Sequence, residues 1–166
     1  MSFNPKGCRD KLAEALLTID GIGRVHKQRR MVRTEQAIKQ HLWDAKEIRT
    51  CGWMISPAAS TTTSAERNPG HRGIGVRGSN NDFVTVQWTI EGFFGLDESK
   101  DSEIVFTDLV WDVVEGHLNR YGMLAIPGIT HQLPANVEMF GYTMFAGTPL
   151  LHYARINIGF RGRPAQ

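Results

Sequence analysis

Three glycines in the stretch HRGIGVRGSN, residues 71–80, have the G-x-G-x-x-G spacing of a dinucleotide-binding turn. Gly73, Gly75 and Gly78 could let the backbone turn tightly and approach a pyrophosphate. That chemistry requires a buried strand before the glycines and a helix directly after them, whose N-terminus meets the phosphates. Here a polar segment precedes the glycines, and the alternating segment FVTVQWTIEG, residues 83–92, follows them. We therefore expect the glycines to permit turns or close backbone approach, and we expect no cofactor at this motif.

The other residues able to do chemistry form no recognisable catalytic or metal-binding set. The histidines lack the spacing of metal ligands; they are His26, His41, His71, His117, His131 and His152. Cys8 and Cys51 lack a C-x-x-C spacing, so we expect two reduced, partly buried thiols in a cytosolic protein. No G-x-S-x-G motif marks a nucleophile. The sequence predicts no catalytic residue, no metal site and no enzymatic activity, with an enzyme of unrecognised site as the alternative.

Three carboxylates, Asp108, Asp112 and Glu115, share part of one face of a predicted helix. Carboxylates placed in this way could serve acid–base catalysis. A solvated helix face explains them as well, and it is the simpler interpretation. We also take these residues as a candidate contact surface for a partner.

Positive charge gathers in RVHKQRRMVR, residues 24–33, although the whole chain carries a net charge of only +2. The segment contains no acid, and its cations are Arg24, Lys27, Arg29, Arg30 and Arg33. Three explanations remain open: a nucleic-acid surface, a contact with an acidic patch on another protein, and an edge strand guarded by positive charges. The segment lacks the aromatic residues that would stack on bases.

Three segments have the pattern of helices that could position these charges. Residues 8–20 form an amphipathic helix that Gly21 and Gly23 stop, and residues 34–43 form a short helix capped by Thr34. In the short helix, Ile38, Leu42 and Trp43 are expected to face inward. The main helix covers residues 102–121, with Ser102 or Asp101 as its N-cap; its apolar stripe is Phe106, Leu109, Val110, Val113, Val114 and Tyr121.

Five segments are predicted as strands: residues 24–33, 47–56, 83–92, 137–147 and 150–160. The clearest alternation is in 83–92, where Val84, Val86, Trp88 and Ile90 share one face and Thr85, Gln87, Thr89 and Glu91 share a solvent-facing one. A strand with one wet side is typical of an antiparallel or mixed sheet. Residues 122–136, which contain two prolines, are predicted to be an irregular connection.

Residues 57–82 are rich in Ser, Thr, Gly, Pro and Asn, and they predict a long projecting loop or hairpin arm. Arg72 and Arg77 are the side chains of this arm expected to touch a partner. Residues 162–166 are expected to be a flexible tail. A length of 166 residues, with 41% hydrophobic and 22% charged residues, indicates one globular domain. The predicted fold class is α+β, a mainly antiparallel sheet with two helices packed on one face.

The order of these elements resembles that of the tail-terminator proteins of long-tailed bacteriophages. The resemblance lies in LLTIDGIGRVH, TVQWTIEGFFGL, DESKDSEIVFTDLVWDVVEGHL and LLHYARINIGFRG, which together span about two thirds of the chain. It is a resemblance of pattern and includes no diagnostic motif. The arm at 57–82 and the segment 122–136 exceed the compact plan of that family.

The resemblance implies a virion structural protein without an active site, located in the tail or neck and assembled in the host cytoplasm. Such a subunit forms a homo-oligomer, expected to be a hexameric ring, that caps the tail tube and joins the tail to the head. Its expected partners are the tail tube protein and neck or head-completion proteins. DNA is a further candidate partner, which would pass through the ring, and no membrane contact is expected. The alternatives are another neck or head-completion component of the same virion, or a small basic nucleic-acid-binding module.

The two charged patches suit such a ring, because cyclic assembly joins one patch of a subunit to a different patch of its neighbour. The candidate interface residues are Arg24, Lys27, Arg29, Arg30, Arg33, Arg72, Arg77, Asp108, Asp112 and Glu115.

Overall fold

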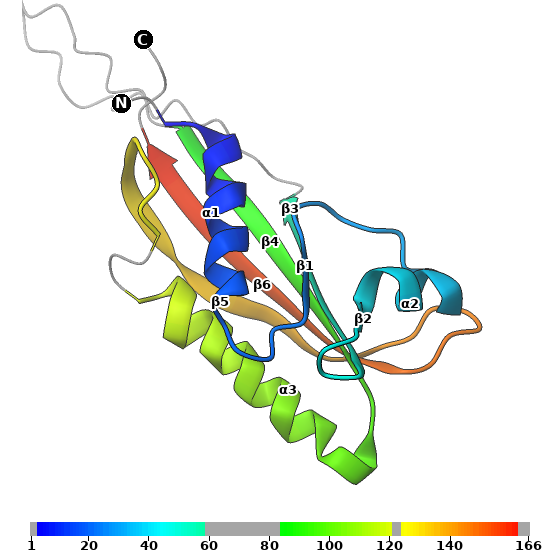
Figure 1. Cartoon of the computed structure of the whole chain (residues 1–166). Coiled ribbons are helices and arrows are strands. Elements are labelled where there is room, and N and C mark those ends of the chain that lie inside the picture. The colour runs from blue at the N-terminus through cyan, green and yellow to red at the C-terminus, as the bar shows by residue number, and fades with distance from the viewer. Residues whose placement is uncertain (1–2, 59–83, 121–123, 163–166) are drawn as a thin grey trace, which may run out of the picture.

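The protein folds as a six-stranded, mostly antiparallel open sheet with three helices (Figure 1). The computed structural model describes residues 3–58, 84–120 and 124–162. The helical elements are α1 (Pro5–Leu17), α2 (Glu35–Leu42), η1 (Glu98–Lys100), α3 (Ser102–Trp111) and the π-helical η2 (Asp112–Leu118). The strands are β1 (Arg24–His26), β2 (Trp43–Asp44), β3 (Arg49–Pro57), β4 (Val84–Gly95), β5 (Ile129–Thr143) and β6 (Leu151–Gly162).

The strand order is β1-β3-β4-β6-β5, and β2 pairs with β3 beside β1. Only the β1–β3 pair is parallel among these; β2–β3, β3–β4, β4–β6 and β5–β6 are antiparallel. The predicted α+β class with a mainly antiparallel sheet is therefore confirmed at this level. The predicted arm falls almost wholly on residues 59–83, which lie outside the described residues, as do Arg72 and Arg77.

One face of the sheet, which we call the helix-covered face, packs against α1 and α3 in the larger apolar core (Figure 1). Leu12 and Leu16 of α1 and Phe106 of α3 are fully buried in it. The sheet contributes every second residue of its central strands: Trp53 and Ile55, Val86, Trp88 and Ile90, and Ala154, Ile156, Ile158 and Phe160. The alternation read from residues 83–92 and 150–160 is thus the pattern that buries this face.

The chain enters β1 through two glycines that a side chain could not replace without strain. Gly21 and Gly23 have φ angles of +71° and +76°. They do not stop the first helix as predicted, because α1 ends at Leu17 with Thr18 as its C-cap. A Cβ atom on Gly23 would come within 2.4 Å of the Cys51 carbonyl oxygen. The two glycines therefore let β1 approach β3 closely.

A buried hydrogen bond fixes the start of α3 to β6. Ser102 Oγ lies 2.8 Å from His152 Nε2 and accepts a hydrogen bond from the Asp97 backbone N–H at 2.9 Å. Asp101 occupies the N-cap position with a φ of +51° but makes no side-chain cap bond. Burial lowers the pKa of His152, which favours its neutral form as the partner of a neutral hydroxyl.

The opposite face, which we call the open face, carries a smaller apolar cluster under α2. Thr34 caps α2 as predicted, because its hydroxyl accepts from the Ala37 N–H at 3.1 Å. Ile38 and Leu42 are buried against this face, but Trp43 is 40% exposed, so its predicted inward position is wrong. Trp43 follows the last residue of α2 and begins β2, so the helical pattern from which its inward position was predicted does not extend to it.

The strand predicted at 24–33 is confirmed only for residues 24–26, which form β1 and pair with β3. The chain then leaves the sheet edge and crosses onto the open face. There the Arg30 backbone N–H meets Met54 Sδ at 3.3 Å, and Val32 is buried in the cluster under α2. Side-chain contacts of this crossing segment, rather than a strand ladder, hold it in place.

The connection predicted at 122–136 is shorter than expected, because β5 begins at Ile129. Pro134 does not prevent the strand, since β5 is an edge strand and its register with β6 shifts between Leu133 and Asn136. Of the tail predicted at residues 162–166, Gly162 instead ends β6 and is buried, and residues 163–166 lie outside the described residues.

Both cysteines are free and buried on the helix-covered face. Burial raises the pKa of Cys8 and of Cys51 to about 12, so both thiols stay protonated near neutral pH. Within the described residues, no helix is long and apolar enough to cross a membrane.

Candidate functional site

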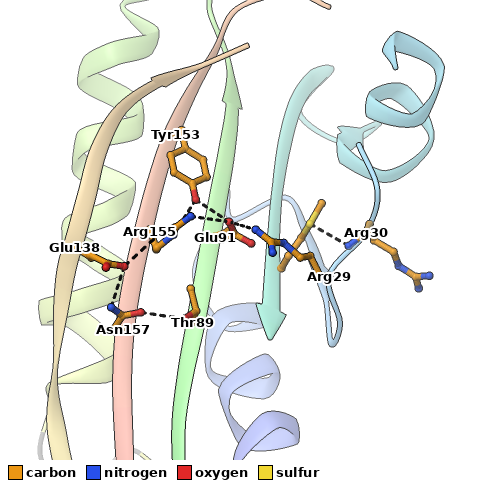
Figure 2. A network of polar contacts seen from close by, with 9 residues as sticks. Arg29, Arg30, Thr89, Glu91, Glu138, Tyr153, Arg155 and Asn157 are labelled. Carbon is orange, nitrogen blue, oxygen red and sulfur yellow. Dashed lines mark hydrogen bonds and ion pairs between the residues drawn. The ribbon is translucent and has the colours of Figure 1, made fainter. Parts of the chain in front are cut away.

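A network of charged and polar side chains lies on the open face, across β4, β6 and β5 (Figure 2). On β4 and β6, alternation along the strand directs these residues away from the helix-covered face, where their immediate neighbours are buried. Its members, which we call the Glu91 network, are Arg29, Thr89, Glu91, Glu138, Tyr153, Arg155 and Asn157.

Glu91 is the centre of the network and is only 3% exposed, although the sequence predicted a solvent-facing position. Its Oε1 atom accepts hydrogen bonds from Tyr153 Oη at 2.7 Å and from Arg29 Nη2 at 2.9 Å. Arg155 Nη2 lies 3.6 Å from the same oxygen. A buried carboxylate needs such partners, because removing it from water is costly unless opposite charge and hydrogen bonds replace the lost hydration.

Tyr153 links Glu91 to Arg155. Its hydroxyl donates to the carboxylate and accepts from Arg155 Nε at 3.1 Å. Burial, together with the bond to Glu91, raises the pKa of Tyr153 to about 12, and the hydrogen bond to Tyr153 raises the pKa of Arg155. Both groups therefore keep their protons near neutral pH. The arrangement suits fixed positioning of charge rather than proton transfer by these two groups.

The outer part of the network continues onto β5. Asn157 donates to Glu138 Oε2 at 3.1 Å and accepts from the Thr89 hydroxyl at 3.0 Å. Arg155 Nη1 lies 3.8 Å from the same Glu138 oxygen. Arg155 thus bridges a buried carboxylate on β4 and a half-exposed one on β5, which fixes the direction of its side chain.

Two hollows flank the network on the open face. The first, which we call the arginine groove, has a volume of about 420 Å³ and lies between the crossing segment and the end of β5. Its lining includes four arginines, Arg29, Arg30, Arg33 and Arg155, and apolar side chains such as Met31, Phe93, Met139 and Phe145. The second hollow, of about 380 Å³, is more polar and shares Arg29, Glu91 and Arg155 with the first. These three residues therefore separate the two hollows.

The basic residues predicted as an interface have different roles in the structure. Three of them are held within the subunit: Arg24 donates to the Gln40 carbonyl, Lys27 to Asp10 and Arg29 to Glu91. Arg30 and Arg33 have no side-chain hydrogen bond or ion pair with any described residue. Figure 2 shows Arg29 pointing into the network and the Arg30 guanidinium pointing away from it.

The predicted acidic residues lie on the other side of the molecule. Asp108, Asp112 and Glu115, which we call the acidic helix face, are exposed on α3 and η2. Glu115 accepts from Asn119 at 3.3 Å. Since α3 packs on the helix-covered face, the sheet separates the acidic helix face from the arginine groove. Trp111, which lies between these carboxylates in sequence, is 58% exposed.

The sequence did not identify Glu91, Tyr153 or Arg155 as site residues. The available signal was the period-2 spacing of polar residues in two strands, which placed them on one side of each strand. Their meeting depends on register, because β4 and β6 pair so that Glu91 lies directly opposite Arg155. Nothing in either segment alone specifies that register.

Among the described residues, no group of three or more His, Cys, Asp or Glu side chains could hold a metal ion. The Ser102–His152 pair is a close hydroxyl–imidazole contact, but both residues are buried and connect α3 to β6. The candidate site is therefore the open face with its arginine groove. Comparison of the chain with protein-family models and with curated proteins finds no match to either.

Proposed function

We propose that this chain is a structural protein of a phage virion, a tail terminator whose subunits form a ring that caps the tail tube and joins the tail to the head. The observation that carries the proposal is the placement of two oppositely charged surfaces, the arginine groove and the acidic helix face, on opposite sides of one sheet. Closed rings require two different patches that face different neighbours. In this proposal the ring is hexameric, and the protein acts by assembly and docking, without catalysis or cofactor.

A second exposed surface supports the assembly role. Outside the arginine groove, the edge strand β5 and its end carry three large apolar side chains that are 38–64% exposed: Val137, Phe140 and Met144. Single apolar residues are ordinary on a surface, but several along one edge strand are typical of an interface. We assign this edge to contacts with the tail tube protein or the neck and head-completion proteins.

The finer plan of the proposed subunit has α1 and α3 as the two-helix layer on one face and residues 57–82 as an arm that reaches a partner through Arg72 and Arg77. The same plan fits another neck or head-completion component, which would also dock by its exposed surfaces. The nucleic-acid-binding alternative has less support, because Arg24, Lys27 and Arg29 are already engaged within the subunit.

The direct test is electron microscopy of the protein mixed with tail tubes that are still able to grow. We expect a sixfold ring at one end of each tube and tubes that stop lengthening, whereas tubes without the protein continue to grow. Tubes that lengthen unchanged and carry no ring would contradict the proposal. A monomer that binds DNA with a steep salt dependence would support the nucleic-acid module instead.

A further inference from the structure

We propose that the arginine groove is the socket for Trp111 and the acidic helix face of a second copy of this chain. The inference rests on the proposed function, because it names the contact that would join neighbouring subunits of the ring. It requires a projecting group on one side of the subunit and a matching recess on the other.

The projecting group is a tryptophan surrounded by carboxylates. Trp111 ends α3 with 58% of its surface exposed. Asp108 precedes it by three residues, Asp112 follows it directly, and Glu115 follows it by four, so all three lie within about one turn of it. Tryptophan at the centre of an interface commonly contributes a large share of binding energy, and surrounding polar groups exclude water from it.

The groove matches this group in size, apolarity and charge. Its volume of about 420 Å³ lies within the range of pockets that hold drug-sized ligands, so the groove is large enough for an indole ring. Phe93, Met139 and Phe145 provide apolar walls, and arginines stand around them. Guanidinium groups stack on indole rings and pair with carboxylates, so the same residues serve the ring and the acids around it.

Two arginines of the groove are available for such pairing. Arg30 and Arg33 have no side-chain partner among the described residues, and the buried Nε of Arg30 lacks an acceptor. Arg155 is already directed by Glu91 and Glu138. The subunit thus holds part of its positive charge in place and leaves the rest unneutralised on the wall formed by the crossing segment.

The occupant is a second copy because other candidates fit less well. Trp111 and the acidic helix face of the same subunit lie on α3 and η2, which pack on the helix-covered face, so they do not enter a groove on the open face. The segment 59–83 carries three arginines against Glu66 and Asp82, so its charge has the same sign as that of the groove. Nucleic acid would use the arginines but not the apolar walls.

The test uses two variants that each damage one side of the contact. The helix variant combines Asp108→Lys with Trp111→Ala, and the groove variant combines Met31→Glu with Arg33→Glu. All four positions are exposed, and none has a side-chain partner among the described residues, so both variants should fold. Circular dichroism and thermal unfolding check this, and Lys46→Glu, at an exposed loop position, is the control for a change of surface charge.

Sedimentation measures assembly of each variant alone and of an equimolar mixture. We expect each variant alone to need at least about tenfold more protein than wild type for half-assembly, because a buried interface tryptophan or charge pair is commonly worth that much. The mixture should form a heterodimer and nothing larger. The intact helix of the groove variant still fits the intact groove of the helix variant. In the opposite pairing, both the helix and the groove carry substitutions, so no second contact forms and the assembly stops at two subunits.

The other outcomes overturn the inference and leave the terminator proposal to be judged separately. If both variants assemble like wild type, other surfaces build the ring. If each variant fails but the mixture gives no heterodimer, the two surfaces are not partners. Wild-type protein that stays monomeric at its solubility limit in low salt shows that the groove does not take a second copy. Loss of DNA binding by the groove variant alone would assign the groove to nucleic acid. In each case, the images of capped tubes decide the terminator proposal.

Discussion

The two faces of the sheet are built from alternate residues of the same strands, yet one face buries apolar side chains under helices and the other also buries a charged network. On β4, Phe94 packs against α3 on the helix-covered face, while its neighbour Phe93 packs under α2 on the open face. On β6, Ala154 is buried under the helices, while Arg155 joins the Glu91 network. One face is closed by the chain's own helices, and the other keeps a charged groove beside a small apolar cluster.

This difference separates stability from recognition. The helix-covered face buries a continuous apolar core, which is the main source of folding free energy in such a domain. The open face buries a carboxylate and holds arginines around a hollow, an arrangement that contributes little net stability but gives a surface with defined shape and charge. Substitutions on the two faces should therefore have effects of different size and kind.

The largest loss of stability should come from the helix-covered face. Phe106 is fully buried, and its ring lies 5.6 Å from those of Phe94 and Phe140. Phe106→Ala should lower the free energy of unfolding by about 3–5 kcal/mol, through lost burial and the cavity left behind. Urea unfolding measures this. The control Leu17→Ala, at a position 61% exposed on α1, should change the free energy of unfolding by less than about 0.5 kcal/mol. If the two variants lose the same free energy of unfolding, the core under the helices is not the main source of stability.

An intermediate loss should come from the centre of the open face. Glu91→Gln keeps the size of the side chain but removes the charge that Arg29 and Tyr153 contact, so we expect a loss of about 1–3 kcal/mol in urea unfolding. The matched change Glu138→Gln, in a side chain 49% exposed, should cost less than about 1 kcal/mol. If the two variants lose the same free energy of unfolding, the burial of Glu91 has no energetic consequence, and the open face has no buried centre that differs from its exposed rim.

The smallest effect should be a loss of stability on mild acidification. Burial lowers the pKa of His152 from the ordinary value of 6.5, so the unfolded chain binds the proton first as the pH falls. Stability is therefore present above pH 6.5 and decreases as the pH falls through 6.5 toward the lower folded-state pKa. Unfolding midpoints across this window measure the change.

His26, whose pKa burial also lowers, should add to this dependence. His152→Gln should flatten it in part, whereas His131→Gln, at an exposed position on β5, should leave it unchanged. If the wild-type unfolding midpoint rises on mild acidification, protonation of His152 stabilises the folded state, and the prediction is wrong.

Local patterns in the sequence determined the elements whose cause is local. The Thr34 cap, the glycines after α1, the apolar stripe from Phe106 to Val114 and the alternation of β4 each depend on residues within one or two turns or on strand periodicity. Such signals act within a segment, so they can be read without knowing what the segment packs against.

Only the tertiary structure decided the features that depend on which segments meet. The register of β4 with β6 brings Arg155 to Glu91 and buries a carboxylate that its own segment predicts to be exposed. The crossing of residues 27–33 over β3, and the continuation of β5 past Pro134 at a sheet edge, likewise depend on the neighbours those residues find. The arginine groove is formed by such meetings, because its walls come from segments far apart in the chain whose contacts no local pattern specifies.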